Sequence, residues 1–140
     1  MPRVVLDVNV WVSALLWSGK PAEIVKAAEE GKVAILASEE IIGEISQVLN
    51  YPKLRKVYQA AGLSHKDLVE AVLKIVRFAE VSKRVSVVVE HQADDKFIEC
   101  ALAAGAEYIV SGDRHLLKIG GYKKTRILSV SEFLGILEAK

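Results

Sequence analysis

Short and almost continuously apolar runs alternate with longer amphipathic segments along the chain. The apolar runs are rich in β-branched residues and lack the polar alternation of a strand with one solvated face. This is typical of strands in a parallel sheet that is covered on both sides. Five runs are predicted to be strands: Val4–Asp7, Val33–Leu36, Ser86–Val89, Tyr108–Val110 and Arg126–Leu128.

The amphipathic segments between these runs have the apolar spacing of helices. Seven are predicted: Val10–Trp17, Pro21–Gly31, Glu39–Asn50, Lys53–Ala61, His65–Ala79, Asp95–Ala104 and Ser131–Ala139. Two pairs, Ser64 with Asp67 and Ser129 with Glu132, have the spacing of a capping box at a helix start. The alternation favours an α/β fold in three layers, α/β/α, around a central and mainly parallel sheet of about five strands.

The organisation of the chain is simple. No linker-like segment, low-complexity tract or internal repeat divides residues 1–140, so we expect a single domain. Two or three of the predicted helices fall between the second and third predicted strands. That is more than one crossover needs, so they could form a lid or an interaction arm.

Composition narrows the class of protein. The chain is 51% hydrophobic and 26% charged with a formal net charge of +1, which is ordinary for a globular protein and does not by itself indicate a nucleic-acid binder. Cys100 is the only cysteine, so no internal disulfide can form. Asp7 interrupts the N-terminal apolar run, and no stretch reaches the roughly 20 residues that span a bilayer. We therefore expect a cytoplasmic protein that does not bind membranes.

Acidic residues follow several of the predicted strands. Asp7 ends the first strand, Ser111 and Asp113 follow the fourth, and Asp94 and Asp95 open the helix after the third. In open α/β sheets ligands bind beyond the carboxyl ends of the strands, so these side chains are candidates for one site. Helix capping is an alternative for Asp94 and Asp95, and a turn for Asp113. Asp7 lies between two apolar runs, and we expect no capping role for it.

Glu44 is a fourth candidate because it lies at the border of the apolar face of its predicted helix, where it could point into a cleft or simply be solvated. Clustered carboxylates resist ionisation unless a cation neutralises them, and oxygen ligands suit Mg²⁺ or Mn²⁺. The histidines, His65, His91 and His115, lack the paired spacing of zinc ligands. Cys100 lies on the apolar side of its helix and is expected in the core.

Four segments taken together resemble a known family. The stretches VVLDVNVWVSALL, EEIIGEISQVL, DDKFIECALAAGAEYIVSGDRHLL and RILSVSEFL resemble the successive motifs of PIN-domain proteins. More narrowly, they are similar to the prokaryotic PIN proteins described as toxin components of toxin–antitoxin systems, akin to VapC-like ribonucleases. The resemblance covers essentially the whole chain. It implies an α/β/α nuclease fold whose acidic pocket binds Mg²⁺ or Mn²⁺ and cleaves single-stranded RNA.

The resemblance also implies roles for single residues. The four catalytic and metal-binding acids of the family match Asp7, Glu44, Asp95 and Asp113. Asn9 and Ser111 match supporting polar positions that contact the carboxylates or the substrate. Asp94 is ambiguous with Asp95 and is expected as a partner of the ligands or a cap. Relatives commonly carry an acid where this chain has His115, which weakens any claim for a fifth carboxylate.

Partners follow from the same resemblance. A VapC-like toxin implies single-stranded RNA as substrate, a small antitoxin protein and a homodimer. Three groups of basic residues could neutralise RNA phosphates or be ordinary solvated faces: Lys53, Arg55 and Lys56; Lys83 and Arg84; and Lys123, Lys124 and Arg126. The alternative function is a catalytically inactive PIN-fold module that binds RNA or protein. A receiver or haloacid-type phosphatase fits poorly, because Asn9 stands where the latter needs a second aspartate.

Overall fold

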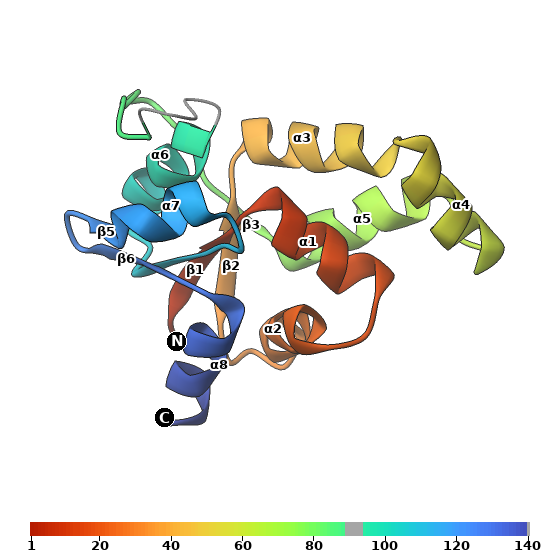
Figure 1. The fold of residues 1–140 in the computed structure, drawn as a ribbon, viewed down its shortest axis with the longest axis horizontal. Helices are drawn as coiled ribbons and strands as arrows, with labels where there is room; N and C mark the ends of the chain where they lie inside the picture. Colours follow the sequence, from red (N-terminus) through yellow and green to blue (C-terminus); the bar gives the residue numbers. More distant parts are fainter. Residues whose placement is uncertain (89–93, 140) are drawn as a thin grey trace.

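A six-stranded sheet runs through the middle of the molecule (Figure 1). The computed structural model describes residues 1–88 and 94–139. The strand order is β3 (Arg77–Phe78), β2 (Ala34–Ala37), β1 (Arg3–Leu6), β4 (Tyr108–Val110), β6 (Thr125–Leu128) and β5 (Gly121–Tyr122). Every neighbouring pair is parallel except β5 and β6, which are antiparallel. The predicted α/β class is confirmed, with six strands where about five were expected.

The central strand is apolar because both of its faces are covered. Val5 of β1 is fully buried and pairs in register with Leu36 of β2 on one side and Ile109 of β4 on the other. Since parallel neighbours end at the same edge of a sheet, the residues that follow β1 and β4 are brought side by side. This edge carries the candidate acids.

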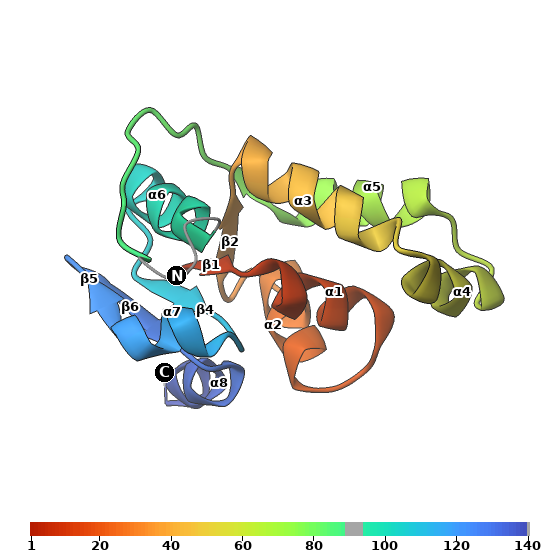
Figure 2. The same cartoon turned by 45° about the horizontal axis from the view of Figure 1, so that its top comes forward.

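Helices lie on both sides of the sheet. They are α1 (Val8–Leu16), α2 (Lys20–Glu29), α3 (Glu39–Leu49), α4 (Pro52–Ala60), α5 (His65–Ile75), α6 (Asp95–Ala104), α7 (Arg114–Ile119) and α8 (Val130–Glu138). Helix α6 packs on β1, β2 and β4, whereas α2 and α8 pack against each other on the opposite side (Figure 2). Phe133 of α8 is fully buried, and its ring meets that of Tyr108 edge-on at 5.5 Å between centroids.

The helices between β2 and β3 extend to one side of the sheet, as both views show (Figures 1 and 2). Helix α3 packs against α1 and α5, and α4 continues beyond it. Tyr58 anchors α4, because its buried hydroxyl donates to the Leu49 carbonyl at 2.8 Å. No described helix combines the length and the apolar character needed to cross a membrane.

Two of the helices begin as their local sequence predicts. Both expected capping boxes form: Ser64 and Asp67 exchange hydrogen bonds at the start of α5, and Ser129 and Glu132 do so at the start of α8. Each box satisfies backbone N–H groups that a helix end otherwise leaves unpaired.

The prediction of a helix over His65–Ala79 is wrong at its end. Helix α5 stops at Ile75, and the chain then turns into β3, where Arg77 pairs with Leu36 and Phe78 with Ala37. The strand is only two residues long, and both are exposed, so it lacks the apolar run by which strands are recognised.

The strand predicted over Ser86–Val89 does not form in its described part, residues 86–88; Val89 lies outside the described residues. The reason is visible in the hydrogen bonds. The amides of Val87 and Val88 donate to the carboxylate of Asp95, at 3.0 and 2.8 Å, instead of to a neighbouring strand. These hydrogen bonds hold the run at the start of helix α6, and its described residues are not part of the sheet.

Candidate acidic site

The carboxylate of Asp7 joins the end of β1 to the start of α1. Its Oδ1 accepts the Val10 amide at 2.8 Å, so Asp7 caps α1, which begins at Val8 and not at Val10 as predicted. The expectation that Asp7 has no capping role is therefore wrong. Its Oδ2 accepts from the Ser111 hydroxyl and, at 3.3 Å, from the Gly112 amide.

The surroundings of Asp7 disfavour the ionised form of its carboxyl group. Burial raises the pKa of the carboxyl above its usual value; hydrogen bonds from Ser111, Val10 and Gly112 lower it, and nearby Asp113 raises it further. The side chain is only 4% exposed, and the net direction is upward. A cation beside Asp7 would favour the ionised form and offset this desolvation.

Ser111 and Asp113 extend the same cluster from the end of β4. The Ser111 hydroxyl is fully buried; it donates to Asp7 and accepts the Asp113 amide at 2.9 Å. Asp113 caps α7 by accepting the His115 amide at 2.8 Å. The sequence did not predict α7, which is too short to show a clear helical period. Its cap nevertheless fixes where Asp113 points.

A small pocket of about 70 Å³ lies between these segments. Its polar lining is Asp7, Asn9, Glu44, Asp94 and Asp113, and its apolar lining is Val8, Val48 and Phe97. We call Asp7, Glu44, Asp94 and Asp113 the pocket acids. They come from the β1–α1 junction, the middle of α3, the residue before α6 and the residue before α7. A space of this size holds an ion with a few water molecules.

Asp95 lies next to this pocket but is used differently. Among the described residues it is Asp94 that lines the pocket, whereas one oxygen of Asp95 accepts both the Val87 and the Val88 amides. One turn further along α6, Glu99 accepts the Val85 amide at 2.9 Å and binds Arg84 at 3.1 Å. Asp95 and Glu99, each 6% exposed, thus hold residues 85–88 against α6.

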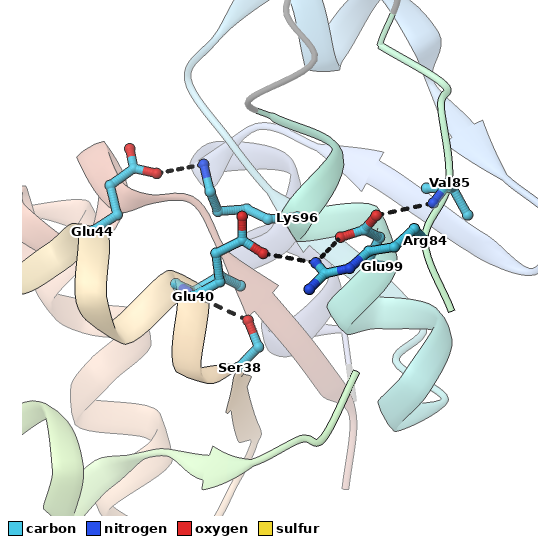
Figure 3. A network of polar contacts seen from close by, with 8 residues as sticks. Ser38, Glu40, Glu44, Arg84, Val85, Lys96 and Glu99 are labelled. Carbon is cyan, nitrogen blue, oxygen red and sulfur yellow. Dashed lines mark hydrogen bonds and ion pairs between the residues drawn. The ribbon is translucent and has the colours of Figure 1, made fainter. Parts of the chain in front are cut away.

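Arg84 links this segment to a second helix. Its guanidinium contacts Glu40 of α3 at 2.9 Å as well as Glu99, so it bridges α3 and α6 (Figure 3). The two carboxylates raise the pKa of Arg84 above its ordinary value. The sequence makes Arg84, with Lys83, a possible phosphate contact, and in this structure its charge already has two partners.

Lys96 is a functional candidate that the sequence reasoning missed. Its Nζ lies 2.5 Å from Glu44 Oε1, and its side chain is only 9% exposed (Figure 3). One signal was available in the sequence. The helix dipole disfavours a positive charge in the first turn of a helix, so the lysine in "DDKF" indicates a compensating partner.

The donor atoms of the pocket fit a hard divalent cation in kind, because all four acids offer carboxylate oxygens. As the side chains stand, no three His, Cys, Asp or Glu residues within 1–88 and 94–139 form a group that could hold a metal ion. The contact with Lys96 turns one of the four, Glu44, toward an ammonium group. Metal binding therefore requires side chains of the pocket to rotate.

Two other nucleophilic or titratable candidates, Cys100 and His65, do not line this pocket. Cys100 is fully buried beside Ser38, and burial raises the pKa of its thiol to about 12, so it stays protonated at neutral pH. This confirms its expected place in the core. His115 is half-buried in the first turn of α7, His65 contacts Ser46 on α3, and His91 lies outside the described residues.

Comparison with known proteins identifies the family and the fold. A family model described as "PIN domain" matches residues 3–115. A search of curated proteins finds no significant match. Among solved structures, the chain is similar to VapBC2 from Rickettsia felis, solved bound to a DNA fragment from its promoter. The TM-score is 0.62 at 12% identity, and the match covers 91% of this chain and 98% of that one.

A second similar structure is VapC20 from Mycobacterium tuberculosis, described as a toxin that cleaves the sarcin–ricin loop. The TM-score is 0.53 at 14% identity, with 88% of this chain and 98% of that chain covered. At these identities the two likenesses establish a shared fold.

Proposed function

Because the chain belongs to the PIN-domain family, we propose that it is a metal-dependent endoribonuclease that hydrolyses phosphodiester bonds of single-stranded RNA. The observation that carries this proposal is the meeting of four carboxylates, from four separate segments, at one small pocket beyond the ends of β1 and β4. Gathered carboxylates repel one another, and a divalent cation bound among them would offset this repulsion.

In this proposal Asp7, Glu44, Asp94 and Asp113 hold Mg²⁺ or Mn²⁺. Such an ion supplies Lewis acidity, which activates water and neutralises charge on the phosphate. Ser111 orients Asp7 by donating to it, and the amide of Val10 fixes the other oxygen. Asn9 is exposed at the same pocket and can donate its amide to a phosphate oxygen.

The resemblance matches Asp95 to the third acid of the family and leaves Asp94 ambiguous with it; we instead propose Asp94 as the ligand. Asp94 lines the pocket, whereas Asp95 already accepts two backbone amides. In this assignment Asp95 is a positioning residue, because it ties residues 87 and 88 to the start of α6 and so helps to fix Asp94.

We further propose that the protein is the toxin of a toxin–antitoxin pair, acts in the cytoplasm, and forms a homodimer. Support comes from the fold it shares with VapC20 and with a VapBC complex. The latter makes a small antitoxin protein the expected partner.

The test is cleavage of a labelled single-stranded RNA by purified protein with Mn²⁺, Mg²⁺ or EDTA. The proposal expects cleavage with either metal, none with EDTA, and loss of cleavage in Asp94→Asn. Glu29→Gln, which changes an exposed carboxylate on α2, is the matched control and should cleave normally.

Folded protein that neither cleaves RNA nor binds Mn²⁺ would overturn the nuclease assignment. It would favour the alternative function, a catalytically inactive PIN-fold module that binds RNA or protein. Cleavage that survives EDTA would instead point to a contaminating or metal-independent nuclease, and Asp94→Asn would distinguish the two.

A further inference from the structure

The acidic pocket already has a cation from the chain itself. Lys96 Nζ lies 2.5 Å from Glu44 Oε1 and 5.2 Å from the centre of the Phe97 ring. Lys96 does not line the pocket itself, but its ammonium group contacts two residues that do, Glu44 and Phe97. Figure 3 shows the two side chains reaching toward each other from α3 and α6.

The position of Lys96 is unfavourable unless this contact compensates for it. Its side chain is 9% exposed, and a buried ammonium needs a partner of opposite charge. It also stands in the first turn of α6, where the helix dipole disfavours positive charge. The contact with Glu44, a carboxylate of the acidic pocket, gives this buried ammonium group the partner that it needs.

We propose that Lys96 is the resident counter-ion of the acidic pocket, and that a divalent cation binds by displacing its ammonium group from Glu44. The inference rests on the metal-binding part of the proposed function. It explains why four carboxylates gather here while no three of the described acidic side chains are set to hold a metal as they stand. Glu44 is the residue that exchanges partners.

The exchange makes a specific prediction for metal affinity. Replacing Lys96 by the apolar but similarly long methionine removes the competitor and leaves Glu44, which is 36% exposed, open to solvent and metal. We expect Lys96→Met to bind Mn²⁺ about tenfold more tightly than the natural protein, in calorimetric titrations after EDTA treatment. Lys96→Arg, which keeps the charge, should restore the natural affinity to within about threefold.

Two controls separate competition for Glu44 from simple charge repulsion. Lys66→Met removes an exposed lysine that pairs with Glu70 at 3.8 Å, and it should leave Mn²⁺ affinity unchanged. In a Glu44→Gln background, Lys96→Met should lose most of its effect, because the shared carboxylate is gone. A full tenfold effect in that background would indicate through-space repulsion and overturn the proposal.

A measurement on the natural protein avoids dependence on the variant's folding. The ¹⁵N signal of the Lys96 ammonium, assigned by its absence in Lys96→Arg, should shift as Mg²⁺ saturates the pocket. If carboxylate ¹³C signals of the pocket acids report Mg²⁺ binding while the Lys96 signal does not move, the exchange does not occur.

The outcomes also separate this inference from the proposed function. Metal binding that tightens in Lys96→Met, without RNA cleavage, would support the exchange and overturn the nuclease. Equal or weaker Mn²⁺ binding by a folded Lys96→Met, with normal RNA cleavage, would overturn the exchange alone. Absence of metal binding in every variant would overturn both.

Discussion

Two groups of carboxylates lie side by side around the start of α6 and differ in what neutralises them. Asp95 and Glu99 accept backbone amides from residues 85–88, and Glu99 also pairs with Arg84. The pocket acids line one small pocket; Asp7 and Asp113 among them also accept backbone amides, and Glu44 pairs with Lys96. The first group ties residues 84–88 to α6, whereas the second lines the pocket in which the proposed function places an outside cation.

Asp94 and Asp95 show the difference between the two groups most clearly, because both side chains are carboxylates. Successive residues of a helix point about 100° apart, so neighbours at its start face different surroundings. Asp95 meets the amides of the 85–88 segment, and Asp94 meets the pocket. Residue type alone therefore does not assign a metal ligand; the donors around each carboxylate do.

The largest expected effect is on catalysis. Asp7→Asn and Asp94→Ala should each lower RNA cleavage by at least about 100-fold, because losing a direct ligand should exceed the 10–100-fold cost typical of outer-shell partners. Single-turnover cleavage with saturating Mn²⁺ measures this. If Asp94→Ala retained full activity while Asp95→Asn lost it with the fold intact, the roles of the two residues would have to be exchanged.

The opposite pattern is expected for stability. Asp95→Ala leaves the part-buried amide of Val87 and the buried amide of Val88 without an acceptor, which should cost about 2–4 kcal/mol in the free energy of unfolding. Asp94→Ala should lower it by less, because Asp94 is only half-buried and does not accept the amides of Val87 and Val88. Urea unfolding in EDTA, followed by circular dichroism, tests the pair. Equal losses of unfolding free energy in the two variants would show that Asp94 and Asp95 do not differ in their structural role.

A third prediction concerns the pH dependence of metal-free protein. The raised pKa of Asp7 means that its ionisation is less favourable in the folded than in the unfolded chain. Natural protein should therefore lose stability relative to Asp7→Asn as pH rises from the unfolded value near 3.8 to the folded pKa. Urea unfolding at several pH values should show a difference that persists at pH 7 and closes at low pH, where both side chains are neutral. A difference of the opposite sign at pH 7 would mean that the native hydrogen bonds outweigh desolvation.

The smallest effect is expected at Arg84. Its side chain is 70% exposed, and its pair with Glu40 is an exposed ion pair of the kind that contributes little to stability, although its other partner, Glu99, is buried. Arg84→Gln should leave Mn²⁺ affinity unchanged and RNA cleavage within about twofold of natural protein. A steep loss of RNA binding in filter assays, with stability intact, would show that Arg84 leaves its carboxylates to contact phosphate.

Much of the architecture followed from the sequence because its signals are local. The buried strands β1, β2, β4 and β6 are short apolar runs, and the capping boxes of α5 and α8 depend on residues three positions apart. What failed depends on distant partners. Residues 86–88 have the composition of a strand, but their amides are taken by Asp95, which no local pattern reveals.

The site shows the same limit. Asp7, Glu44 and Asp113 were singled out by their places after strands and on a helix border, and the structure brings them to one pocket. The choice between Asp94 and Asp95 depends on a rotation of one residue about the helix axis. Lys96 was not identified from the sequence, because a single lysine on a helix cannot be assigned a role until its partner, Glu44, is known.

The two edge strands of the sheet, β3 and β5, are each two residues long. Within the described residues the longer strands, β1, β2, β4 and β6, are all interior, so each edge offers an incoming strand only a very short row of unpaired backbone groups. Such margins resist the edge-to-edge pairing by which β-proteins aggregate. They also limit how another protein can bind. Adding a strand at either edge would form few hydrogen bonds, so the helices offer a partner more contact surface.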